Sequence, residues 1–159
     1  MMTLGDWLDK WDMTGLKFSA YFLGLELKFN DGDRKAAWEM YIELLTRVTT
    51  QYLTPNQGDE AAALASVHKL FPITRGIIKH YGKSCLEFTR IAIVVLNQVI
   101  RPFTTKWHGK LVHGSINDPE ERRIFREELR SLQNILRNYT RMLGRLAGVE
   151  EDLTDIEDV

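Results

Sequence analysis

Cysteine is nearly absent from this chain of 159 residues, which contains only Cys85. A single thiol excludes an internal disulfide and any zinc site built from several cysteines. Because apolar residues follow Cys85 at helical spacing, we expect this side chain to lie in the core. The sequence also lacks a glycine-rich phosphate loop, a nucleophile-elbow serine and a Glu-x-x-His pair. We therefore predict no cofactor and no metal site.

The sequence also lacks a hydrophobic run long enough to cross a membrane. The longest uncharged apolar run covers residues 91–100 and is interrupted by Asn97 and Gln98, whereas a spanning helix needs about 20 apolar residues. The N-terminal stretch MMTLGDWLDKWD has no apolar core of the length of a signal peptide. We therefore expect a soluble, cytoplasmic protein without a membrane partner.

Charge is unevenly distributed along the chain. The net charge is −1, but residues 150–158 contain six acidic residues and no base, so residues 1–149 carry a net charge of +5. We interpret residues 1–149 as one domain and residues 150–159 as an acidic C-terminal tail. A mildly basic body beside such a tail could bind polyanions weakly, or it could bind its own tail.

Hydrophobic periodicity predicts a mainly α fold, a bundle of about four to five helices with a short N-terminal β-hairpin. Apolar residues three and four apart favour helices at about 4–11, 34–53, 60–71 and 73–81, and again from about Ser84 to Pro102. The last helix should run from Pro119 to Ala147, with a heptad seam along one side. Period-two alternation on both sides of Gly24 predicts the hairpin over 16–30.

Two pairs of residues suggest an enzymatic alternative. The spacings Arg75 to His80 and Arg101 to His108, on a helical domain, resemble the Arg-x4–6-His ribonuclease motif of the HEPN superfamily. That resemblance implies that the two side chains meet in a cleft between subunits, where histidine moves a proton and arginine holds the scissile phosphate. Arginine is frequent in this chain, and Pro102 and Gly76 stand where the family usually has a polar residue. We therefore favour no catalytic residue.

Two segments are candidate protein-binding surfaces. Trp7 and Trp11 share one face of the first predicted helix, which either docks on its own domain or anchors a partner. The stretch RPFTTKWHGK, residues 101–110, places Arg101, Lys106, Trp107 and His108 at the end of an apolar helix. These residues either complement the carbonyls and dipole at a helix end or bind a partner. The hairpin edge is a third candidate surface.

The last predicted helix offers a candidate polyanion site. Arg126, Arg130, Arg137 and Arg141 fall near one stripe of this helix. A nucleic acid could use such a stripe as a phosphate track. The acidic tail follows these arginines directly, so neutralisation by the tail or by a partner protein is the alternative.

Four segments resemble a group of small, uncharacterised bacterial proteins: DRKAAWEMYIELLTR, LFPITRGII, VLNQVIRPFTTKWH and FREELRSLQNIL. The resemblance covers about Leu16 to Val149 and brings no established activity with it. It implies an accessory subunit of a bacterial multi-protein system, one of anti-phage defence or signalling. We therefore expect a non-enzymatic adaptor or regulatory subunit that binds another protein or a second copy. The alternatives from other classes are a ribonuclease and a nucleic-acid-binding accessory protein.

Overall fold

The computed structural model describes residues 2–13, 20–47, 60–114 and 117–155, and it confirms the predicted helical bundle. The α-helices are α1 (Leu4–Lys10), α2 (Ala20–Leu23), α3 (Asp31–Leu45), α4 (Glu60–His68), α5 (Leu70–Tyr81), α6 (Leu86–Val95), α7 (Arg101–Val112) and α8 (Pro119–Leu146). Short helical turns are η1 (Gly82–Cys85), η2 (Leu96–Ile100) and η4 (Leu153–Asp155). No element of the described residues is long and apolar enough to cross a membrane.

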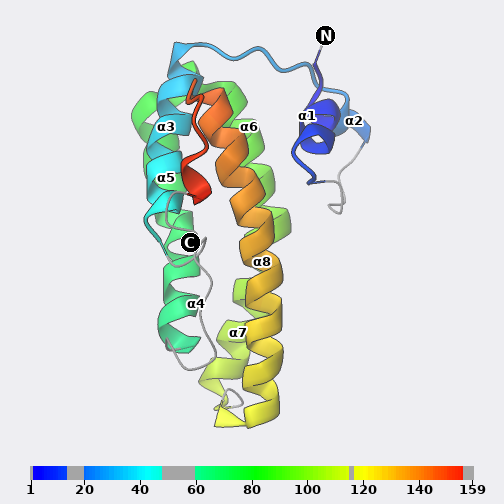
Figure 1. Cartoon of the computed structure of the whole chain (residues 1–159), viewed down its shortest axis with the longest axis vertical. Helices are drawn as coiled ribbons and strands as arrows, with labels where there is room; N and C mark the ends of the chain where they lie inside the picture. Colours follow the sequence, from blue (N-terminus) through cyan, green and yellow to red (C-terminus); the bar gives the residue numbers. More distant parts are fainter. Residues whose placement is uncertain (1, 14–19, 48–59, 115–116, 156–159) are drawn as a thin grey trace.

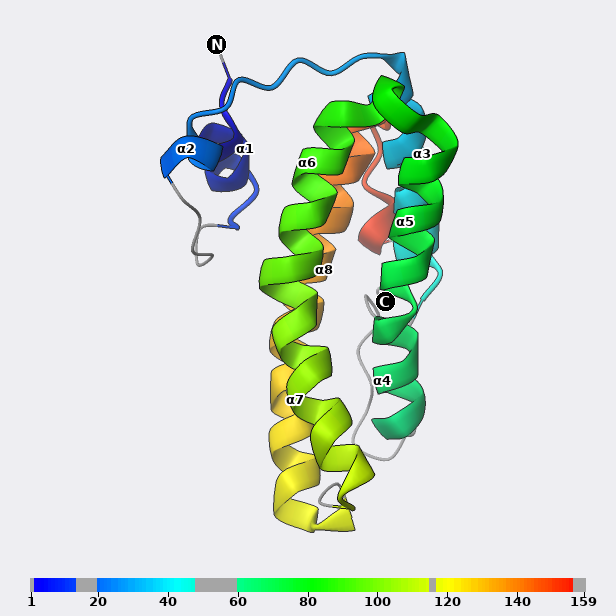
Figure 2. The same ribbon diagram turned by 180° about the vertical axis from the view of Figure 1, so that it is seen from behind.

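The bundle is elongated, and α8 runs along its whole length (Figure 1). The segments α3, α4–α5, α6–α7 and α8 run alternately down and up the long axis, so that consecutive segments are antiparallel (Figures 1 and 2). α3 packs against α8, α5 and α6, while α4 packs against α7. α1 and α2 lie to one side of the bundle and connect to α3 through the extended residues 24–30 (Figure 1).

The N-terminal helix begins where the sequence predicts, but the prediction of a β-hairpin is wrong. The Thr3 hydroxyl accepts a hydrogen bond from the Asp6 backbone N–H at 3.1 Å, which caps α1. Residues 20–23 form the helical turn α2, and residues 16–19 lie outside the described residues. Residues 25–27 are extended, yet they bond to the residues before α1, with Leu27 donating to the Met2 carbonyl at 2.9 Å. Alternation marks one buried side of an extended segment and does not say which segment pairs with it.

α3 begins three residues earlier than predicted, because Asn30 and Asp33 form a reciprocal cap. Asn30 accepts from the Asp33 N–H at 3.0 Å, and Asp33 accepts from the Asn30 N–H at 2.9 Å. Gly32 lets this end of α3 approach η1 closely. A Cβ atom on Gly32 would lie 2.2 Å from the Ser84 carbonyl oxygen, so no larger residue fits there.

Two prolines lie in the first turns of helices. The predicted helices 60–71 and 73–81 are separated at Pro72, but the break between α4 and α5 falls at Lys69. Pro72 lies in the first turn of α5, where its missing N–H leaves no donor unpaired. Pro102 lies in the first turn of α7, directly after the π-helical turn η2. Proline has no N–H to donate within a helix, and the wider π-helical turn before Pro102 accommodates this missing hydrogen bond. The helix therefore continues to Val112.

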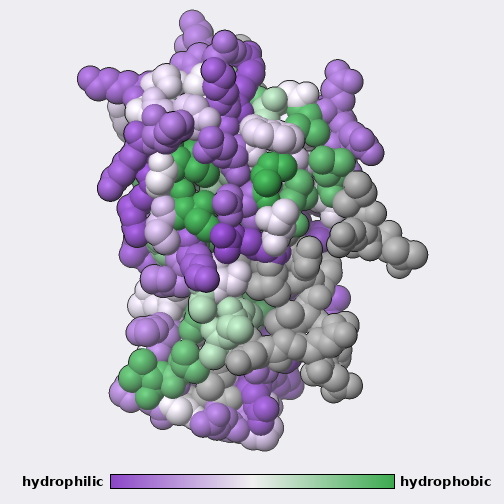
Figure 3. Space-filling model, turned by 90° about the vertical axis from the view of Figure 1, so that its left-hand side faces the viewer, coloured by the Kyte–Doolittle hydropathy of each residue, from purple (hydrophilic) through white to green (hydrophobic). Residues whose placement is uncertain are grey.

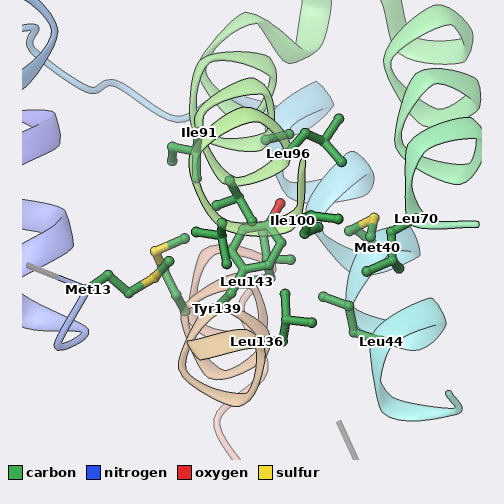
Figure 4. Close-up of a cluster of buried hydrophobic side chains, with 14 of the residues drawn as sticks. Met13, Met40, Leu44, Leu70, Ile91, Leu96, Ile100, Leu136, Tyr139 and Leu143 are labelled. Atoms are coloured by element: carbon green, nitrogen blue, oxygen red, sulfur yellow. The ribbon is translucent and has the colours of Figure 1, made fainter. Parts of the chain in front are cut away.

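α8 closes the core as its heptad pattern predicts. It begins after the Asp118 cap with Pro119 in its first turn, and Gly148 follows its end with φ 87°. The seam residues are all buried: Phe125, Leu129, Leu132, Leu136, Tyr139, Leu143 and Leu146. Figure 4 shows this seam meeting side chains from α3, α5, α6 and η2, with Met13 approaching from the N-terminal segment. Cys85 is buried as expected.

Candidate protein-binding surface

The first candidate catalytic pair does not share a helix face. Arg75 and His80 are both exposed on α5. Five residues of an α-helix turn through about 140° beyond one full turn, so the two side chains leave the helix in different directions. The His80 ring instead lies edge-on to Tyr81, with ring centroids 4.7 Å apart.

The second pair shares a face but is separated along it. Arg101 and His108 are exposed on α7, seven residues and therefore about 10 Å apart along the axis. The Arg101 guanidinium lies over the Phe71 ring, 4.8 Å from its centroid, and its Nε donates to Asn97 Oδ1 at 3.2 Å. Neither pair is brought together within one chain.

Trp107 is a core residue, which corrects its assignment to a partner-binding patch. It is fully buried, and its ring stands edge-on to Phe125 with centroids 5.1 Å apart. Its indole N–H donates to Glu128 Oε2 at 2.7 Å. Lys106 forms an ion pair with the same carboxylate. Trp107 and Lys106 therefore attach α7 to α8. Of the predicted patch, Arg101, Lys106 and His108 are exposed.

Trp7 also packs within its own domain. It is 5% exposed, and its ring meets Phe29 edge-on with centroids 5.0 Å apart. Trp11 is partly buried and lies 6.1 Å from Trp7. Of the two alternatives for this helix, Trp7 therefore follows docking on its own domain, which corrects its assignment as a partner-binding residue. Within the described residues 20–30 the hairpin edge does not form, because residues 20–23 are helical.

Three arginines of the α8 stripe contact groups of the same chain, two of them carboxylates and one a backbone carbonyl. Arg126 Nε donates to Glu60 Oε1 at 3.0 Å. Arg141 Nε donates to Asp152 Oδ2 at 3.1 Å, and Arg137 donates to the Thr154 carbonyl at 3.2 Å. Arg130 lies on the exposed side of the same helix. The tail thus provides partners for two of the arginines that the sequence offered to a polyanion.

A shallow groove between α3 and α5 carries exposed apolar side chains. Trp38 is 46% exposed and Ile42 is 37% exposed, although both are large and hydrophobic. The groove has a volume of about 450 Å³, and its lining residues are Trp38, Glu39, Ile42, Glu43, Pro72, Ile73, Gly76 and Ile77. Figure 3 views this side of the molecule and shows green hydrophobic surface among purple hydrophilic side chains. We call this surface the α3/α5 groove.

Helical periodicity alone does not predict the α3/α5 groove. The buried side of α3 comprises Ala36, Ala37, Met40, Tyr41 and Leu44. Trp38 and Ile42 lie four residues apart on another side of the same helix. The sequence signal that could have revealed the groove is the number of apolar residues in AAWEMYIELL, which is too large for one buried helix face.

The charged residues that line the α3/α5 groove, Glu39 and Glu43, both belong to α3. The Glu39 carboxylate in the groove accepts a hydrogen bond from the Tyr81 hydroxyl at 2.6 Å, and this bond raises the pKa of Tyr81. α5 contains Arg75, Lys79 and His80 but no acidic residue. Among the described residues, none of these three forms an ion pair. None of these three bases lines the groove, whose α5 side consists of Pro72, Ile73, Gly76 and Ile77.

No protein-family model, curated protein or solved structure matches the chain. Within the described ranges, no three histidine, cysteine, aspartate or glutamate side chains gather to hold a metal ion. The function is therefore inferred from the geometry of the surface.

Proposed function

We propose that this chain is a non-enzymatic interaction subunit that binds an amphipathic helix of a partner protein in the α3/α5 groove. The observation that carries the proposal is the exposure of Trp38 and Ile42 beside a groove lined by apolar residues of α5. Contiguous exposed apolar surface is typical of protein interaction sites, and tryptophan is favoured at the centres of interfaces.

The shape of the groove supports a helix as its occupant. α3 and α5 are antiparallel neighbours, so a third helix could lie along the groove with its apolar side toward Ile42 and Ile73. Gly76 lines the groove, and a Cβ atom built there meets nothing within 4 Å. The absent side chain leaves room for the backbone of a docked helix.

The charges favour a partner helix with basic residues beside its apolar stripe, because the charged residues that line the groove are Glu39 and Glu43. Glu39 and Glu43 are already partnered, by Tyr81 and Arg47. The Tyr81 hydroxyl is a neutral donor, so the negative charge of Glu39 remains to meet a base of the partner. We place the complex in the bacterial cytoplasm, as part of a defence or signalling system, on the basis of the resemblance.

The proposal is tested by capturing partners on three immobilised forms of the chain. Ile42→Glu places a charge in the groove, while Ile93→Glu makes the same change at a site on α6 that is 46% exposed. We expect a protein from the source organism to bind wild type and Ile93→Glu and to be lost from Ile42→Glu. Circular dichroism must show that both variants are folded. Equal capture by all three forms would exclude the groove as the docking site.

A further inference from the structure

The acidic tail turns back along α8 after the helix ends. The Val149 N–H donates to the Gly144 carbonyl at 2.8 Å, and Gly148 takes the positive φ that this reversal requires. The tail then passes Arg141 at Asp152 and Arg137 at Thr154, so it runs antiparallel to the helix. Figure 1 shows this C-terminal segment, in red, between α3 and α8.

The surface beneath the tail contacts both its side chains and its backbone. Arg141 Nε donates to Asp152 Oδ2 and to Thr154 Oγ1, each at 3.1 Å. Arg137 is 8% exposed and donates to the Thr154 carbonyl. The Tyr41 hydroxyl accepts from the Leu153 N–H at 3.3 Å. One backbone donor and one backbone acceptor of neighbouring residues are thus recognised, a combination that a polypeptide offers and a nucleic acid backbone does not.

This surface is built by the packing of α3 against α8. The Tyr41 ring lies on Gly144, where a Cβ atom would be 2.9 Å from Tyr41 Cε2. Gly144 therefore lets the phenol sit close to α8 with its hydroxyl at the tail. A hollow of about 220 Å³ remains beside the tail, with Trp11, Tyr41 and Arg145 among its lining residues. In the described part of the chain, Arg145 forms no ion pair. We call Tyr41, Arg137, Arg141 and Arg145 the α8 cradle.

Within the described residues, the tail contacts the α8 cradle through Asp152, Leu153 and Thr154. Leu153 is partly buried, and Glu151 and Asp152 are exposed. Burial opposes ionisation of Asp152, but hydrogen bonds from Thr154 and Arg141 prevail and lower its pKa. Exposed ion pairs contribute little because water and salt screen them. The tail is favoured over a separate peptide chiefly because it belongs to the same chain, which gives it an effective concentration at the α8 cradle on the order of millimolar.

We propose that the α8 cradle is a binding site for an acidic peptide segment of a partner protein, and that residues 150–155 occupy it as an internal ligand until that segment displaces them. The chemistry defines the ligand as an extended or turn segment with an aspartate, a following aliphatic residue and accessible backbone groups, as in Asp152-Leu153-Thr154. The site is separate from the α3/α5 groove, and neither proposal depends on the other.

The test measures binding of a fluorescent peptide, VEEDLTDIEDV, to the full chain by anisotropy. Wild type should bind it weakly, because the tethered tail competes. The variant Asp152→Asn/Leu153→Ala weakens the tail and should bind the peptide about tenfold more tightly. Adding Arg141→Ala to that variant should abolish this gain in affinity for the peptide. Adding Arg122→Ala instead, which changes an exposed arginine in an early turn of α8, should preserve it.

Any one of four outcomes would overturn the proposal. The weakened-tail variant binds the peptide no more tightly than wild type, or Arg141→Ala leaves binding unchanged. A single-stranded oligonucleotide of equal charge binds more tightly than the peptide, which would make the cradle a general polyanion site. The last is that wild type sediments as a dimer while Asp152→Asn/Leu153→Ala sediments as a monomer. That result would mean that the tail of a second copy occupies the α8 cradle.

Discussion

The buried carboxylate of Asp33 joins the starts of two helices that are distant in sequence. Its Oδ2 accepts the Asn30 N–H at the start of α3, and its Oδ1 accepts the Phe88 N–H in the first turn of α6 at 2.9 Å. Asp33 is fully buried. Both helix starts present unpaired N–H groups and a positive dipole end, so one anion satisfies donors of each.

Removing the Asp33 carboxylate should strongly destabilise the fold. Asp33→Ala leaves two buried N–H groups without acceptors, and we expect a loss of about 2–4 kcal/mol in the free energy of unfolding. Asp31→Ala is the matched control, because Asp31 is an exposed acid in the same helical turn; its cost should stay below about 0.5 kcal/mol. Urea denaturation followed by circular dichroism measures both. Equal costs would show that Asp33 acts only through the helix dipole.

The contact between Gly32 and η1 should tolerate no side chain. Gly32→Ala puts a methyl group 2.2 Å from the Ser84 carbonyl oxygen, so α3 and η1 must separate. We expect a loss of about 2 kcal/mol or more in stability. Gly109→Ala in α7 meets nothing within 4 Å and should instead stabilise by up to about 1 kcal/mol, through helix propensity. Thermal melting distinguishes the two, and a stabilised Gly32→Ala would contradict the close approach.

Trp107 should behave as a core residue and His108 as a surface residue. Trp107→Ala empties a fully buried site next to Phe125 and leaves Glu128 without its indole donor, and we expect a cost of about 3–5 kcal/mol. His108→Ala should change stability by less than about 0.5 kcal/mol. Chemical denaturation of both variants is the measurement. A small effect at Trp107 would restore this residue as a candidate for partner binding.

Glu87 should make stability depend on pH in a defined direction. Burial raises the pKa of Glu87, although Arg90 lies 2.6 Å away and lowers it. Below the ordinary pKa of a glutamate, Glu87 is neutral in both the folded and the unfolded state, so its burial costs no free energy of ionisation. As the pH rises through the pKa that Glu87 has in the folded state, its charge must form at a partly buried position, and the free energy of unfolding falls. Glu87→Gln should therefore be more stable than wild type at pH 7.

The comparison is repeated at about pH 4, where wild-type Glu87 is largely protonated. The advantage of Glu87→Gln should shrink or disappear there. An advantage of equal size at both pH values would attribute it to packing rather than to ionisation. An advantage that grows on acidification would contradict the sign derived from burial.

Local patterns predicted the helices well, because their determinants are close in sequence. The Thr3 cap, Pro119 in the first turn of α8 and the heptad seam from Phe125 to Leu146 all act within a few residues of each other. The prediction of the hairpin failed because the segment that pairs with residues 25–27 is distant in sequence. The partner of residues 25–27 is the segment before α1, and no local pattern states which of two extended segments will pair.

The candidate surfaces depended on neighbours that periodicity does not identify. RPFTTKWH has the composition of a binding patch, and only the position of Glu128 on α8 makes Trp107 a buried donor. In the same way, α3 offers aromatic residues on more than one side. Where α5 and α8 lie decides that Tyr41 is buried and Trp38 remains exposed.

The sequence by itself determined that this chain forms amphipathic helices and which side of α8 is buried, because helix caps and apolar spacing act over one or two turns. It also supplied a basic helix and an acidic tail, which could attract each other or other molecules. Only the tertiary structure decided that the tail lies on Arg137 and Arg141 and that Trp38 faces solvent. Those outcomes depend on which distant segments share a surface, and burial and electrostatics act through space rather than along the chain.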